Sequence, residues 1–184
     1  MNNSKLSSAT KILSRITEVI LFIAAAVCLV ITIICALVFN QNTIDMITSM
    51  VTDGTLMVSG FVIPQLESLS EIRSAAVLTC VGAFISCMLG ALIFRNIVRV
   101  FNNTENTRTP FTSENVKLIR SIGHYAIATP FVGVVRDILI GIICHVSITA
   151  HVEITTLLMG MIVLCLSRFF EYGVTLEDDV KGMI

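Results

Sequence analysis

The sequence predicts an all-α integral membrane protein, a four-helix bundle with the N- and C-termini in the cytoplasm. Three observations support this fold class. First, 55% of the 184 residues are hydrophobic and only 14% are charged, whereas soluble domains carry about 25% charged residues. Second, the apolar residues form blocks long enough to cross a bilayer. Third, nearly all basic residues lie in the two terminal segments and the central loop region, which four spans would place on the same side of the membrane.

The first span is predicted over about residues 14–39, after a polar lead (1–11) that we expect to be mobile. From Ile16 to Phe39 there are 24 residues with one charge, Glu18. As a helix these residues would measure roughly 36 Å, enough to cross about 30 Å of hydrocarbon. The run is too long for a signal peptide, and no small-residue cleavage site follows it. It is therefore expected to stay in the membrane.

Residues 40–73 are predicted to form an outer loop. Ile44, Ile47, Met50 and Val51 recur at helical spacing, which indicates a short amphipathic helix at the membrane interface. Irregular chain follows, and the segment serves either as a packed cap or as a binding surface.

The second span is predicted over about residues 74–98 and the third over about 121–147. Each carries small residues four apart, a pattern that lets helix backbones approach closely in lipid. We expect the two stripes to pack against each other. The helix-packing residues are Gly82, Ser86 and Gly90 on the second span, and Gly133 and Gly141 with Thr129 and Asp137 on the third.

A polar cytoplasmic loop is predicted between these spans, over residues 99–120. Pro110 ends the preceding structure. Thr112 or Ser113 then caps a new helix, and Glu114 suits the positive end of that helix.

The fourth span is predicted over about residues 152–172, followed by a cytoplasmic tail over 173–184. Gly173 is interpreted as the glycine that ends the span. Thr175 and Asp178 are spaced as a weak cap for a final short helix.

The distribution of Lys and Arg predicts the orientation. Ten basic residues lie in the N-terminal segment, the central loop region and the C-terminal segment, against one in the two remaining loops. Basic residues concentrate in cytoplasmic loops, so both termini and the central loop should be cytoplasmic. The ten are Lys5, Lys11, Arg15, Arg95, Arg99, Arg108, Lys117, Arg120, Arg168 and Lys181, and the one is Arg73.

Arg136 and Asp137 form a predicted intramembrane polar site, with Thr129 on the same helix. A charge at mid-bilayer costs about 2.5–3.5 kcal/mol on insertion scales, so it needs a partner or a wet cavity. Neighbouring helical residues point about 100° apart, and we therefore expect the two not to pair simply with each other. The site is either functional, for sensing, ion passage or proton relay, or a structural polar clamp.

Catalytic, metal and cofactor sites are not indicated. The six cysteines lie in apolar blocks without a C-x-x-C pair, and the sequence has no G-x-S-x-G, H-E-x-x-H or phosphate-loop motif. His145, His151 and Glu153 come nearest to a ligand set, and we expect no metal there. The net charge of −1 gives no indication of direct nucleic-acid binding. We expect no enzyme activity and no cofactor.

Three places together resemble one family: residues 94–127, the span that follows them, and residues 168–184. The first contains Pro110, Phe111, Thr112, Glu114 and Asn115, followed by Arg120, Ser121, Ile122 and Gly123; the last contains Phe170, Gly173, Leu176, Asp178 and Asp179. They are similar to the bacterial four-span inner-membrane proteins of domain-of-unknown-function family 2975. The resemblance implies no catalytic residues. Members are often encoded beside a small helix-turn-helix regulator, which by analogy implies a membrane protein that signals to, or sequesters, a cytoplasmic transcription regulator.

A regulatory or sensory role is therefore the leading functional hypothesis, and the predicted location is the bacterial inner membrane. A small transporter or channel subunit that uses Arg136 and Asp137 is the alternative, and a lipid-directed enzyme is a distant third. Each helix of a four-span bundle also faces lipid, which allows a homo-oligomer. The expected cytoplasmic partner surface comprises Arg99, Arg108, Pro110, Phe111, Thr112, Glu114, Asn115, Glu177, Asp178 and Asp179.

Overall fold

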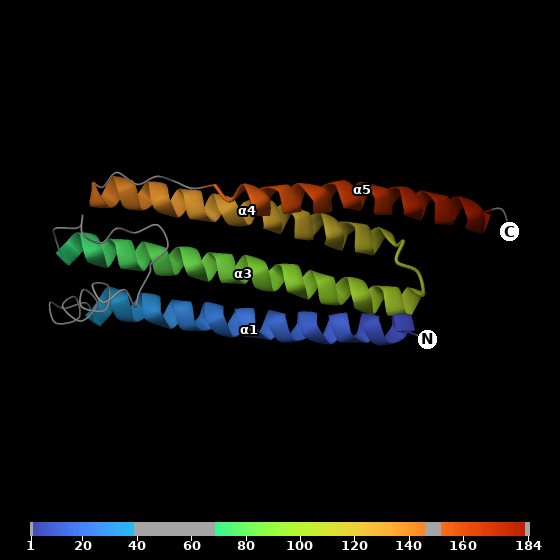
Figure 1. Ribbon diagram of the computed structural model, residues 1–184, viewed down its shortest axis with the longest axis horizontal. Coiled ribbons are helices and arrows are strands. Elements are labelled where there is room, and N and C mark those ends of the chain that lie inside the picture. Colours follow the sequence, from blue (N-terminus) through green and yellow to red (C-terminus); the bar gives the residue numbers. More distant parts are fainter. Residues whose placement is uncertain (1, 39–68, 146–151, 183–184) are drawn as a thin grey trace. The chain divides into compact units, whose positions relative to one another are not determined.

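A computed structural model describes residues 2–38, 69–145 and 152–182. These residues form four α-helices: α1 (Asn2–Val38), α3 (Leu69–Thr107), α4 (Ser113–Cys144) and α5 (Ile154–Gly182) (Figure 1). Each helix contains a segment long and apolar enough to cross a membrane. The described residues therefore confirm an all-helical protein with four candidate spans. The predicted interfacial helix and most of the outer loop lie outside the described residues.

The helices are longer than the predicted spans. α3 continues to Thr107 and α4 begins at Ser113, so the connection expected over 99–120 shortens to residues 108–112. The polar lead expected to be mobile is helical from Asn2. The helices are longer than predicted because hydrophobicity indicates only the part of a helix that contacts lipid. Polar residues can continue the same helix into water when a neighbouring helix supports it.

The prediction that Gly173 ends the last helix is wrong, because α5 runs through it to Gly182. Because glycine has no Cβ, it can adopt the left-handed conformation that ends many helices. For the same reason, another side chain can pack closely against a glycine inside a helix. The second property applies at Gly173, as described below. The proposed separate short helix after Thr175 is part of α5.

The chain divides into two compact units. The first contains residues 1–24, 86–131 and 153–184, and therefore one end of α1, of α3 and of α4 together with α5. In this unit α3 lies beside α1, because Gly90 faces Leu21 and Lys11 pairs with Glu105. α4 and α5 are also adjacent in this unit, where Gly123 faces Leu164 and Gly160 faces Ile127.

Close packing of α4 and α5 in the first unit depends on two glycines. A Cβ added at Gly123 would lie 2.6 Å from Leu164, and one added at Gly160 would lie 2.6 Å from Ile127. Both distances are too short for any real Cβ contact, so the two backbones approach each other as small residues allow in membrane helices. Gly123 and Gly160 lie on different helices, so no pattern within one helix indicates this pair.

The second unit contains residues 25–85 and 132–152, with its described part drawn from α1, α3 and α4. Its buried cluster consists of Ala75, Ile140 and Cys144, with Leu78 packed against it. The Cys144 thiol donates to the carbonyl oxygen of Glu71 at 3.4 Å. All six cysteines are free thiols.

Candidate interaction site at the α3–α4 connection

The α3–α4 connection is a hydrogen-bonded corner. Arg108 adopts a positive φ of 59°, a left-handed conformation that reverses the chain after a helix. The Thr107 hydroxyl bonds to the carbonyl oxygen of Thr109 at 2.8 Å. At the start of α4, the backbone N–H of Asn115 donates to Thr112 Oγ1 at 3.2 Å. Thr112, and not Ser113, is therefore the cap, which resolves the alternative that the sequence left open.

Asn115 holds the corner together from the inside. Its side chain is fully buried, and its Nδ2 donates to Thr104 Oγ1 at 3.2 Å and to the carbonyl oxygen of Pro110 at 3.1 Å. One amide group thus links the end of α3, the connection and the start of α4. Buried polar groups of this kind are expensive to leave without partners, so Asn115 stabilises one conformation of the corner.

Phe111 attaches the corner to α5. Its ring centroid lies 5.6 Å from that of Phe170, a separation typical of favourable aromatic pairs. The same ring covers Gly173, where an added Cβ would lie 2.6 Å from Cε1 and 3.0 Å from Cγ. We call Phe111, Phe170 and Gly173 the latch. Gly173 therefore provides the flat surface on which Phe111 rests.

A polar contact reinforces the latch. Thr109 Oγ1 donates to Glu177 Oε2 at 2.6 Å, a short distance that is typical of a hydroxyl bonded to a carboxylate. Glu177 lies about one helical turn beyond Gly173. The corner therefore contacts α5 at two successive turns, once through an aromatic ring and once through a hydrogen bond.

Ion pairs surround the corner at the surface. Lys11 pairs with Glu105 at 2.6 Å, and Glu171 accepts from both Arg120 and Arg168 at 3.1 Å. Each pair is partly exposed and contributes little stability on its own. Together they connect α1 to α3 and α4 to α5, so in the first unit the predicted interaction region is tied to all of the helices.

The predicted partner surface is divided by burial. Exposed members are Arg99, Arg108, Phe111, Glu114, Asp178 and Asp179; Pro110, Thr112 and Glu177 are half-buried; Asn115 is buried. Asn115 Nδ2 and Thr112 Oγ1 bond within the corner, and Asn115 is buried, so the accessible chemistry is that of the exposed charges and of Phe111. Sequence reasoning missed Thr109 and the packing role of Gly173, because no local pattern links residues more than sixty positions apart.

In the second unit, Arg136 and Asp137 do pair with each other, so the contrary expectation is wrong. Arg136 Nε donates to Asp137 Oδ1 at 2.9 Å, and a second guanidinium nitrogen lies 2.8 Å from the same oxygen. Consecutive helical side chains diverge at Cβ, but the long, flexible arginine stem folds back far enough to close the gap. Both side chains are mostly buried, with 23% and 14% of their surface exposed.

The packing stripes also differ from expectation. Arg136, and not Asp137, lies over Gly82, where an added Cβ would be 2.9 Å from Arg136 Cδ. Gly90 instead faces Leu21 of α1, and nothing lies within 4 Å of a Cβ placed at Gly133. The small residues of α3 thus serve different neighbours. Thr129, on α4 in the first unit, donates to the carbonyl oxygen of Tyr125 at 3.0 Å, within its own helix.

Among the described residues, no group of three or more His, Cys, Asp or Glu side chains could hold a metal ion. The arrangement offers ion pairs, hydrogen bonds and an apolar surface, which are the elements of binding.

Comparison with known proteins assigns the family. Residues 62–182 match the model described as "Protein of unknown function (DUF2975)". The chain belongs to this family. No curated protein and no solved structure matches the chain. The DUF2975 match covers α3, α4 and α5, and therefore includes the corner, the latch and the Arg136–Asp137 pair, whereas α1 precedes it.

Proposed function

We propose that this DUF2975 protein is a non-enzymatic regulatory or sensory protein of the bacterial cytoplasmic membrane, which signals to or sequesters a cytoplasmic partner such as a small helix-turn-helix transcription regulator. The observation that supports it most is the latch. Phe111 and Thr109 attach the corner to α5, so exposed charges from two chain regions form one preorganised surface. Preorganisation lowers the entropy lost on binding a partner.

The proposed orientation places this surface in the cytoplasm. Ten of the eleven basic residues outside the middle of a span belong to the two termini and the region around the corner, and such an excess favours the cytoplasmic side. A transcription regulator could therefore reach the surface without crossing the membrane.

The proposed signal arises at or near the Arg136–Asp137 pair, or in the outer loop. α4 carries both Asp137 and the capped corner at Thr112, and it contains Pro130 between them. A proline inside a helix removes one backbone hydrogen bond and weakens the helix locally. α4 is therefore the direct covalent link between the polar pair and the proposed output surface.

Capture of a regulator tests the proposal. The tagged protein is co-expressed with a candidate small helix-turn-helix regulator and purified in mild detergent. We expect Arg108→Glu to reduce the captured regulator several-fold, because Arg108 is exposed at the corner. Glu153→Lys is the control, since Glu153 is an exposed charge just before α5 begins, at the end of that helix away from the latch. Absence of capture by the unaltered protein, or equal loss in both variants, would sink the proposal.

A small transporter or channel subunit is the second candidate, favoured by one observation. A mostly buried ion pair within a candidate span is typical of substrate and ion pathways. If the protein transports an ion, Asp137→Asn should abolish flux into liposomes while the protein stays folded. Flux unchanged by Asp137→Asn would exclude the pair as a transport site.

A further inference from the structure

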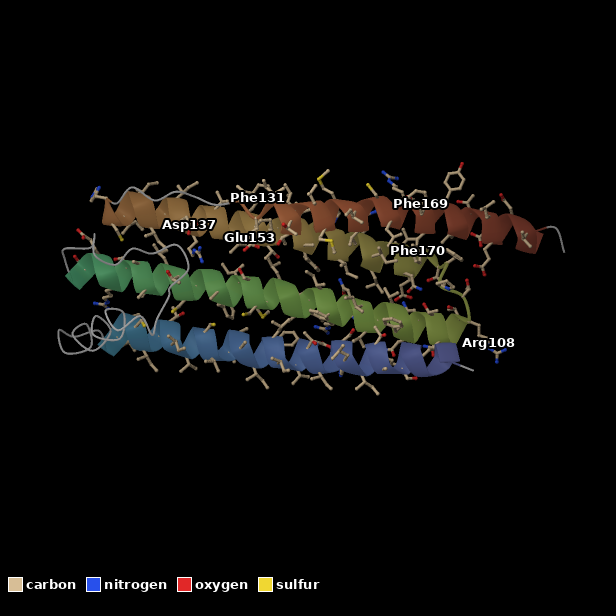
Figure 2. The ribbon with its side chains drawn as sticks, viewed as in Figure 1. Arg108, Phe131, Asp137, Glu153, Phe169 and Phe170 are labelled. Atoms are coloured by element: carbon tan, nitrogen blue, oxygen red, sulfur yellow. The ribbon has the colours of Figure 1, made fainter. Side chains whose placement is uncertain are left out.

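The outer side of α5 carries an apolar ridge, formed by Phe169, Tyr172, Leu176 and Val180. Their exposed fractions are 73%, 75%, 59% and 53%. The spacing of three, four and four residues places them on one face of the helix. Figure 2 shows Phe169 on the outer side of α5 and Phe170 on the side of the corner, so the ridge and the latch lie on different faces.

Arginines on the helices of the first unit lie at one height, and we infer that the hydrocarbon ends there. Arg120 pairs with Glu171, and Arg168 pairs with the same carboxylate. Arg99 precedes Thr104 by five residues and Arg120 follows Asn115 by five, and Thr104 and Asn115 are hydrogen-bonded. Arg99 and Arg120 are therefore at the same height on adjacent antiparallel helices. Guanidinium groups remain in the interface or in water, not among acyl chains.

α1 adds a further arginine at this height. Lys11 pairs with Glu105, and Leu21 packs on Gly90. Arg15 lies between those two contacts, which places it opposite the Arg99 region of α3. All four helices of the first unit thus carry an arginine at one height, three of them on exposed positions.

Most of the ridge extends beyond that height. Leu176 lies eight residues past Arg168, which corresponds to about 12 Å along the helix, and Val180 lies about 18 Å past it. Phe169 and Tyr172 are at the interface, where aromatic rings are common. Leu176 and Val180 are consequently too far out for acyl chains to cover them.

The ridge also borders a recess. An open hollow of about 600 Å³ is lined by Phe111, Phe169, Phe170, Tyr172, Gly173 and Leu176. The latch thus forms one wall of the hollow and the ridge forms the other. A hollow lined by aromatic rings suits an aliphatic or aromatic anchor side chain.

The charges at the ridge are acidic. From Tyr172 to Val180 the chain contains Glu177, Asp178 and Asp179 and no basic residue. Asp178 and Asp179 are exposed. A second copy docked on the same face about a two-fold axis would bring these acids together, which is unfavourable.

We propose that the ridge is a docking surface for an amphipathic helix whose apolar stripe is flanked by lysine or arginine. The apolar stripe covers Tyr172, Leu176 and Val180, one anchor side chain enters the hollow, and the basic flank faces Asp178 and Asp179. This inference rests on the proposed function, since it specifies the chemistry of the cytoplasmic partner.

Two synthetic helices test the proposal. Both carry the same leucine stripe, and one is flanked by lysine and the other by glutamate. Binding to the full chain in phosphatidylcholine nanodiscs is measured by fluorescence anisotropy, with empty nanodiscs subtracted. We expect the lysine helix to bind about tenfold more tightly than the glutamate helix. Asp178→Asn with Asp179→Asn should remove that preference.

Leu176→Ser should weaken binding of the lysine helix by about tenfold. Leu13→Ser is the matched control, since the exposed fraction of Leu13 on α1, 65%, is similar to the 59% of Leu176. The Leu13→Ser protein should bind the lysine helix with unchanged affinity. Equal losses in the two variants, or equal affinity for both helices, would overturn the proposal. So would a dimer of the unaltered protein that Leu176→Ser dissociates, since a second copy would then occupy the ridge. Regulator capture that succeeds without lysine-helix binding would refute this inference and leave the proposed function standing.

Discussion

Gly173→Ala is the substitution that probes the latch most sharply. In an exposed helix interior, glycine to alanine usually stabilises by roughly 0.5–1 kcal/mol. At Gly173 the new Cβ would meet the Phe111 ring at 2.6 Å from Cε1, whereas ordinary van der Waals contact begins near 3.4 Å. The ring must therefore be compressed or displaced, and the free energy this costs opposes the usual stabilisation by alanine.

Two limiting cases give the size of the stability loss in Gly173→Ala. If the ring stays, overpacking costs about 1–3 kcal/mol. If the ring swings away, the aromatic contact with Phe170 is lost, which costs about 0.5–1.5 kcal/mol. Gly133→Ala is the matched control, because nothing lies within 4 Å of its added Cβ. The propensity gain is shared by the two substitutions, so Gly173→Ala should be less stable than Gly133→Ala by about 0.5–3 kcal/mol.

The assay is equilibrium unfolding in mixed detergent micelles followed by far-UV circular dichroism. A cycle with Phe111→Ala isolates the contact, because Gly173→Ala should lose its penalty once the ring is gone. If Gly173→Ala proved as stable as Gly133→Ala, or if its penalty persisted without the ring, Phe111 would not rest on Gly173.

Three further predictions concern the corner and the polar pair. Thr112→Ala should destabilise the protein by about 0.5–2 kcal/mol, while Ser113→Ala should have little effect; equal effects in thermal unfolding would mean that Thr112 is not the cap. Asn115→Ala should cost about 1–3 kcal/mol, because it removes two hydrogen bonds inside the corner, each worth about 0.5–1.5 kcal/mol; a neutral result would show that these bonds contribute nothing. Asp137→Leu should destabilise strongly, and adding Arg136→Leu should restore most of the stability. A double variant as unstable as Asp137→Leu would refute the pairing.

Local sequence patterns were sufficient to predict the four helices and the start of α4. Four apolar blocks predicted four helices, and Pro110 followed by Thr112 predicted a capped helix, which α4 confirms at Ser113. These features depend on neighbouring residues only, and the physics of capping and of hydrophobic length acts over a few turns.

Local sequence patterns did not predict the contacts between residues far apart in the chain. Gly173 has the local character of a helix end, and only the Phe111 ring, more than sixty residues away, explains its place inside α5. The Arg136–Asp137 pair was missed because Cβ directions were considered without the reach of the arginine side chain. The stripe through Gly82 and Gly90 was assigned one neighbour, whereas the structure places a different neighbour against each glycine.

We propose that the corner and the acidic end of α5 form a cytoplasmic output surface. Asn106 is exposed at the end of α3, so Asn106→Cys in a chain whose six native cysteines are replaced gives a direct measurement. The account predicts that a membrane-impermeant thiol reagent labels this cysteine only after the cells are permeabilised. Labelling in intact cells would place the corner outside the cell and contradict the account.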